Sequence, residues 1–179
     1  MTAADSQLLQ AAIWYVRQQF GVFPVWSPND DGSCRCPAGR ACGQPGKHPI
    51  PPTGFKAATL DEAKIRTFLA APSGPNIGIT PPPGDFGWDV DGDVPQTIAE
   101  LTDQLGPLPS TLTTITGHGT HLILRWPEGV ERPKGHPFGI VTRWADTGYL
   151  IGAGSRHASG AIYRLELGDG AGLIFIAAL

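Results

Sequence analysis

The chain has 179 residues, with a formal net charge of −3 and 16% charged residues. This length suits one ordinary domain that buries its own core, and the charge excludes a uniformly basic nucleic-acid-binding protein but not a local basic patch. The 24 glycines and 18 prolines exclude a bundle of long helices, because these residues interrupt helices and favour short elements joined by turns.

The first third of the chain is predicted to combine a helix, a strand and a long loop. Apolar residues recur every three or four positions over 5–20 and predict a helix that ends at Gly21. A short apolar strand is expected over 22–26. The following segment, 27–54, is dense in Gly, Pro and Cys. A loop of that length needs something to hold it in place.

The middle of the chain alternates helices with strands. Thr59 and Glu62 form a capping-box pattern that predicts a helix running to about Ala71. Apolar runs then predict strands over 76–80 and 86–91, the second of which ends in acidic residues.

The remaining elements are short and include a hairpin. Pro95 is expected to begin a helix that Gly106 ends. Strands over 111–116 and 121–126 are expected to pair through a glycine-rich turn. Further strands are predicted over 138–143, 147–151 and 161–167. This order predicts an α+β fold with few short helices around a mixed, largely antiparallel sheet, in a single domain over 1–179.

The three cysteines fall within one short segment of the 27–54 loop. Cys34, Cys36 and Cys42 precede His48, and thiolates with an imidazole are the ligands of a tetrahedral structural zinc. Bound zinc would also explain how such a loop stays ordered. The alternative is three reduced surface thiols and an unrelated histidine. An odd number of cysteines, with no export signal, argues against disulfides.

Two carboxylates stand at the end of the 86–91 strand. Asp89 and Asp91 share one face of a strand, because side chains alternate with period two, and together they could hold divalent ions beside a phosphate. A calcium loop is a weaker interpretation, since Val94 stands where that loop needs glycine. The pattern also fits a nucleotide-sugar transferase, a nucleotidyl-transfer metal site, or a solvated turn.

The histidines of the predicted hairpin and the charge pattern add to this picture. His121 is expected to face the same side as Ile123, where it could donate to a triphosphate, whereas His118 is expected at the exposed tip. The segment 67–120 has no Lys or Arg, and the segment 31–66 before it is basic. This asymmetry suits a cation site with an anionic ligand lying across it.

Four motifs in order resemble a known family. They are Lys47-His48-Pro49, Asp89-Val90-Asp91, Gly119-Thr120-His121 and the segment 148–163. Together they resemble the primase–polymerase (prim-pol) domain of the archaeo-eukaryotic primase superfamily. The resemblance implies an RRM-like catalytic core with a zinc-stabilised loop over 27–54. It also implies a metal-dependent nucleotidyltransferase that joins nucleoside triphosphates on a single-stranded DNA template in DNA replication, as primer synthesis or extension.

The resemblance also implies roles for individual residues. Asp89 and Asp91 would hold catalytic Mg²⁺ or Mn²⁺, and His121 would contact the nucleotide phosphates. The family's third carboxylate falls at Val141, so Asp146 is the candidate to replace it. Further nucleotide-binding candidates are Lys47, Arg125, Arg143 and Ser155.

The sequence and the resemblance also lead to expectations about localisation, neighbouring domains and alternative functions. The polar N-terminus lacks a secretory pattern, and no apolar run reaches the ~20 residues that span a bilayer, so we expect a cytoplasmic protein without membrane contact. The apolar finish over 172–179 suggests a fragment of a longer protein, and the family suggests a fused or associated helicase in a plasmid or phage. The alternatives are a non-catalytic module that binds nucleotides or single strands, and a metal-dependent nucleotide-sugar transferase.

Overall fold

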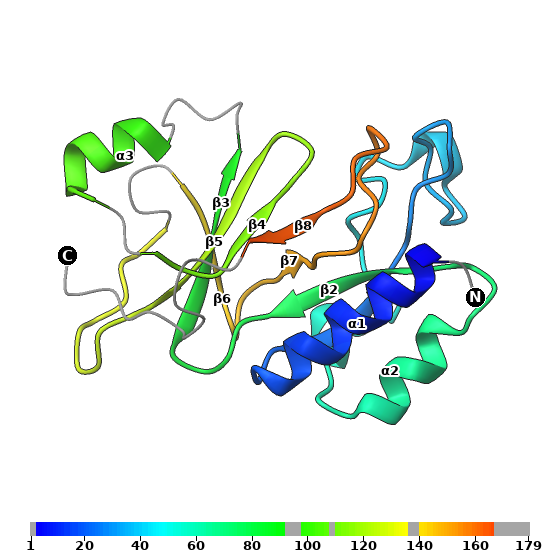
Figure 1. Cartoon of the computed structure of the whole chain (residues 1–179), viewed down its shortest axis with the longest axis horizontal. Helices are drawn as coiled ribbons and strands as arrows, with labels where there is room; N and C mark the ends of the chain where they lie inside the picture. Colours follow the sequence, from blue (N-terminus) through cyan, green and yellow to red (C-terminus); the bar gives the residue numbers. More distant parts are fainter. Residues whose placement is uncertain (1–2, 92–97, 108–109, 136–139, 167–179) are drawn as a thin grey trace.

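The structure is a computed structural model that describes residues 3–91, 98–107, 110–135 and 140–166. Figure 1 shows the first two helices side by side beneath one group of strands, and the third helix at the opposite end of the molecule. The helices of the described residues are α1 (Ala3–Arg17), α2 (Glu62–Leu69), α3 (Ile98–Leu105), and the short 3₁₀ turns η1 (Gly39–Ala41) and η2 (Gly54–Ala57).

The strands form two antiparallel sheets. The three-stranded sheet has the order β1-β2-β7, with bounds Gly21–Val25, Asn76–Thr80 and Leu150–Ile151. The five-stranded sheet has the order β6-β3-β5-β4-β8. Its strands run over Val141–Trp144, Asp85–Asp91, Gly119–Arg125, Thr113–Ile115 and Arg164–Glu166. The α+β class and the antiparallel pairing are confirmed, whereas the single expected sheet is divided into two.

Strand β5 shows how the sequence builds the larger sheet. Leu122 and Leu124 point into a cluster with Phe86, Trp88 and Leu101 of α3. Ile123 points the other way, into the core formed by α1, α2, β1 and β2. Strand side chains alternate with period two, so His121 shares the Ile123 face, as the sequence predicted. A third apolar cluster packs Phe23 and Val25 of β1 and Ile151 of β7 against Tyr163, which precedes β8.

The start of α2 differs from the expected capping box. Asp61 is the N-cap residue, and its carboxylate accepts hydrogen bonds from the backbone amides of Ala63 and Lys64. Thr59 instead pairs its backbone with Val22 of β1 in an antiparallel bridge. The cap is therefore Asp61 rather than Thr59, which lies two residues before it, and α2 begins at Glu62.

Several expectations fall outside the described residues. These are the start of the third helix at Pro95, the first residues of the 138–143 strand and the apolar finish over 172–179. Within the described ranges, no helix is long and apolar enough to cross a bilayer.

Candidate active site

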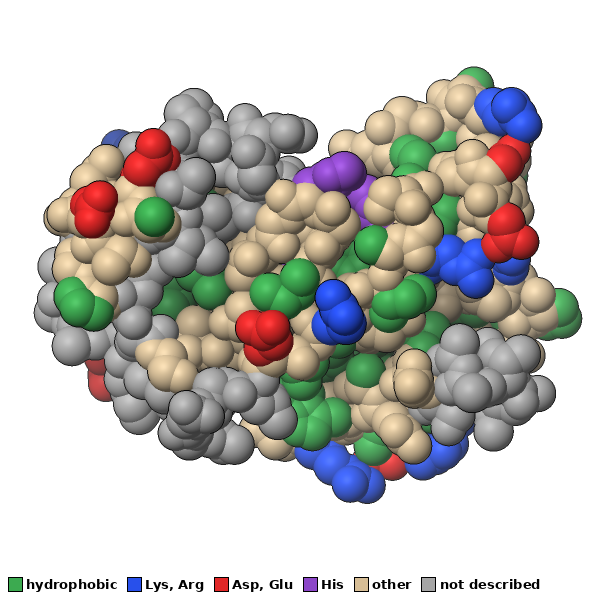
Figure 2. All heavy atoms as spheres, turned by 45° about the horizontal axis from the view of Figure 1, so that its top comes forward, with side chains coloured by type: hydrophobic (Ala, Val, Ile, Leu, Met, Phe, Trp, Pro, Cys, Tyr) green, Lys and Arg blue, Asp and Glu red, His purple; other side chains and the backbone are tan. Residues whose placement is uncertain are grey.

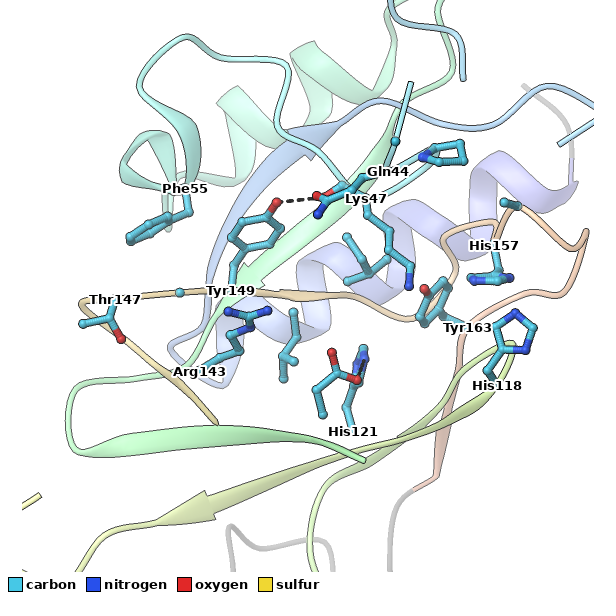
Figure 3. Close-up of a pocket in the computed structure, with 17 residues that line it drawn as sticks. Gln44, Lys47, Phe55, His118, His121, Arg143, Thr147, Tyr149, His157 and Tyr163 are labelled. Carbon is cyan, nitrogen blue, oxygen red and sulfur yellow. Dashed lines mark hydrogen bonds and ion pairs between the residues drawn. The ribbon is translucent and has the colours of Figure 1, made fainter. Parts of the chain in front are cut away.

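A pocket of about 620 Å³ lies between the 27–54 loop and the two sheets (Figure 3). β3, β5 and β6 contribute Asp89, His121 and Arg143, and the loop contributes Lys47. In Figure 2, histidine side chains gather at the notch on the upper side of the molecule. The pocket is also lined by Gln44, Phe55, His118, Tyr149, His157 and Tyr163.

An acid–imidazole pair lines the pocket, with the histidine buried and the carboxylate partly exposed. Asp89 on β3 lies directly opposite His121 on β5 in the sheet register, and His121 Nε2 is 3.3 Å from Asp89 Oδ1. His121 is only 5% exposed. Burial alone would raise the pKa of Asp89, but the hydrogen bond and charge of His121, with the charges of Lys47 and Arg143, lower that pKa below its usual value. Asp89 is therefore ionised at neutral pH.

The other nitrogen of His121 has an unusual environment. Nδ1 is buried, and none of the described residues forms a hydrogen bond with it. Buried polar atoms normally have partners.

A second histidine lines the pocket beside Tyr163. The backbone amide of Ser159 donates to His157 Nδ1 over 3.1 Å, so Nδ1 is the acceptor and a proton on this ring is on Nε2. A Cβ added to Gly117 would stand 2.4 Å from the same Nδ1. The hairpin can therefore approach His157 only because residue 117 is glycine.

The cysteine cluster forms at one side of the pocket. The ligand atoms of Cys34, Cys36, Cys42 and His48 all lie within 4.8 Å of one another. Cys34 Sγ is 3.4 Å from His48 Nε2, and a tetrahedral zinc places sulfur and nitrogen ligands about 3.5 Å apart.

The pKa values of two cysteines in this cluster move in opposite directions. At Cys36 burial is outweighed by hydrogen bonds from Cys34 and from the backbone amides of Ala38 and Gly39, so its pKa is lowered, whereas burial raises the pKa of Cys42. Donors aimed at sulfur stabilise thiolate ligands. The predicted Cys₃His set is thus brought together with the chemistry and spacing that zinc requires.

Comparison with known proteins decides the family. The family model described as the N-terminal domain of bifunctional DNA primase/polymerase (Prim-Pol) matches residues 12–172. This chain belongs to the Prim-Pol family. No curated protein gives a match. The matched region includes every residue of the pocket and of the cysteine cluster, so the resemblance stated from the motifs is confirmed. Primase/polymerase-type function follows for this chain.

Three predicted nucleotide-binding or catalytic residues of this prim-pol chain lie away from the pocket. Arg125, the last residue of β5, forms a two-point ion pair with Asp85. Asp85 and Arg125 are paired four positions along the strands from Asp89 and His121, about 13 Å away at the usual strand rise. Arg125 is a basic residue close in sequence to the His121 motif, but the length of β5 places it at the far end of the strand.

Asp146 and Ser155 also have other partners. Asp146 pairs with Arg132 at 2.9 Å and remains 65% exposed, and it does not line the pocket. The Ser155 side chain is fully buried, and its hydroxyl contacts the backbone of Ile77. The structure therefore brings neither the proposed third carboxylate nor this hydroxyl to the pocket.

The prim-pol pocket could hold a divalent ion at Asp89. A carboxylate kept ionised in a cavity is a suitable ligand for Mg²⁺ or Mn²⁺. Asp91 follows two positions along β3, opposite Gly119, and its side chain lies outside the described part of the chain.

Sequence reasoning did not single out several pocket residues. His157, Tyr149, Tyr163 and Phe55 line the cavity but were not assigned roles. His157 and Tyr163 do fall inside the 148–163 motif, which could have marked them. Phe55 follows the Lys47 motif, but nothing in its own spacing indicates that it reaches the pocket.

Proposed function

We propose that this chain binds a nucleoside triphosphate in the pocket and transfers its nucleotide to a 3′-hydroxyl end on a single-stranded DNA template. The observation that carries this proposal is the ionised Asp89, paired with buried His121 and faced by the cations Lys47 and Arg143 in one cavity. Among the lining side chains that the structure describes, Asp89 is the one carboxylate beside several cationic or protonatable groups, and this arrangement suits a polyanion that arrives with a metal ion.

The phosphates have donors on more than one side of the cavity. Lys47 comes from the loop and Arg143 from β6, so the two can hold phosphate oxygens from different directions. His121 can add a hydrogen bond from its unsatisfied Nδ1 once that nitrogen is protonated, while Nε2 stays on Asp89.

We assign the divalent ion to Asp89 and Asp91, as the family resemblance implies. When bound, such an ion neutralises phosphate charge and activates the attacking hydroxyl. The role of His121 in this assignment is to fix the orientation of the Asp89 carboxylate, because it holds one of its two oxygens.

A binding-only role is the second candidate. It is favoured by Asp146, which is engaged by Arg132 rather than placed in the pocket. In that case the pocket would hold nucleotides or single strands, and no primer would be made or extended. We propose the basic segments 31–66 and 125–164 as template contacts in either case, and an associated helicase stays a prediction.

The two candidates are separated by an assay on single-stranded DNA. Purified chain would be given primed and unprimed templates with Mg²⁺ or Mn²⁺ and either ribo- or deoxynucleoside triphosphates. We expect products from the wild type and at least a hundredfold loss in Asp89→Asn, a typical size for removing electrostatic stabilisation. Asp103→Asn on exposed α3 is the matched control. Nucleotide binding without any product would favour the binding-only role, and equal product from Asp89→Asn would refute the catalytic assignment.

A further inference from the structure

The segment between two ligands of the cysteine cluster also forms one side of the pocket. Cys42 and His48 belong to the Cys₃His set, and residues 43–47 lie between them. The lining residues from this segment are Gly43, Gln44, Pro45 and Lys47. We call residues 43–47 the pocket wall. Lys47, the one cation of the wall, is directly bonded to the ligand residue His48.

The wall is attached to the rest of the molecule by hydrogen bonds to its backbone. The Tyr149 hydroxyl donates to the Lys47 carbonyl over 2.8 Å, as the dashed line in Figure 3 marks. The Asn76 side-chain amide donates to the Gly46 carbonyl over 3.0 Å. Tyr149 itself packs edge-on against Phe23 of β1, with ring centroids 5.2 Å apart. Each of these two hydrogen bonds therefore connects the wall to a residue of a sheet or of its core.

The loop buries few apolar side chains that could hold the wall, although its end is tied to β1, where the Trp26 amide donates to the His48 carbonyl over 3.0 Å and Pro49 pairs with Val25. In the described chain, the buried residues of 27–54 are Ser27, Pro28, Cys34, Cys36 and Gly46, two of which are cysteines of the cluster. The segment has one 3₁₀ turn, η1, before η2 begins at Gly54. Where a loop lacks an apolar core, bound metal supplies the energy that orders it.

We propose that the metal of the Cys₃His cluster and the Tyr149 hydroxyl together position Lys47 for the nucleotide phosphates, so that metal occupancy sets nucleotide affinity. This inference rests on the proposed function and adds a task for the cluster beyond stabilising the loop. His48 and Tyr149 are positioning residues, because they act through Lys47. A lysine carries a single charge on a flexible chain, so its contribution depends on where its backbone is held.

The test measures the dissociation constant of a non-hydrolysable nucleoside triphosphate, together with zinc content by elemental analysis. Tyr149→Phe keeps the ring and removes only the hydrogen bond. We expect it to weaken binding about fivefold, the equivalent of one neutral hydrogen bond. Chelation of the zinc should weaken binding by at least as much. In a Lys47→Ala background both effects should disappear, because the group they position is gone.

Two controls separate the possible failures. Asp30→Asn changes an exposed residue of the same loop that pairs with Arg156, and it should leave the dissociation constant unchanged. If the wild type binds triphosphate while zinc removal and Tyr149→Phe leave affinity unchanged, the inference is refuted and the proposed function stands. If zinc-loaded wild type binds no triphosphate, the proposed function itself fails. Tyr149→Phe keeps the test decisive even where chelation unfolds the loop.

Discussion

The ion pair between Asp85 and Arg125 provides a test of whether Arg125 stabilises the fold or binds phosphate. Arg125 Nε lies 2.6 Å from Asp85 Oδ1, and Nη2 lies 3.2 Å from Oδ2. The Asp85 side chain is 1% exposed, whereas that of Arg125 is 35% exposed. Arg125→Ala would therefore leave a buried carboxylate without its partner and without ready access to water.

The magnitude follows from this burial. Removing one partner of a buried ion pair costs about 3–5 kcal/mol, and the partial exposure of Arg125 places this case near the lower end, at about 3 kcal/mol. For a chain of this size that lowers Tm by roughly 6–12 °C. The measurement is urea and thermal unfolding, followed by circular dichroism. The exposed pair between Arg40 and Asp31 gives the matched comparison, and Arg40→Ala should cost less than about 1 kcal/mol.

The same variant also tests the position of Arg125 relative to the pocket. Because its guanidinium is engaged about 13 Å along the strands from the site, Arg125→Ala should leave the triphosphate dissociation constant unchanged at a temperature where the protein is folded. A variant of normal stability that binds triphosphate poorly would show that the ion pair is not the main role of Arg125.

Three further predictions concern the site and the cluster. The lowered pKa of Asp89 means that its ionised form stabilises the fold above the unfolded-state pKa, and that this contribution is lost as pH falls through the folded-state pKa. The difference in unfolding free energy between wild type and Asp89→Asn, measured by urea titration, should therefore shrink from neutral pH to about pH 3; a constant difference would contradict this. Gly117→Ala should displace His157, cost about 1–3 kcal/mol and weaken triphosphate binding, whereas Gly43→Ala, whose Cβ meets nothing within 4 Å, should not destabilise the fold. Purified wild type should contain one zinc per chain by elemental analysis and Cys36→Ser much less; equal zinc in both would remove Cys36 from the ligand set.

The parts of the site that could be predicted are those that depend on local spacing. The alternation of side chains along a strand predicted the face on which His121 lies. The close spacing of cysteines and a histidine within 34–48 predicted the Cys₃His set. Both signals need only neighbouring residues. The expectations for Arg125 and Asp146 came from charge near a motif, and the structure places both residues outside the pocket lining. Charge alone does not tell which partner a side chain meets, and each of these has an opposite charge closer than the pocket.

The sequence by itself determined the α+β class, most of the elements, the family and the ligand types of the cysteine loop, because periodicity, turn residues and motif order are properties of the chain alone. Tertiary structure decided the division into two sheets and the register that sets Asp89 against His121. It also decided the arrival of Tyr149 at Lys47, across 102 positions. Such pairings depend on how apolar faces that are distant in the sequence pack together. The free energy of that packing cannot be deduced from a short stretch of sequence.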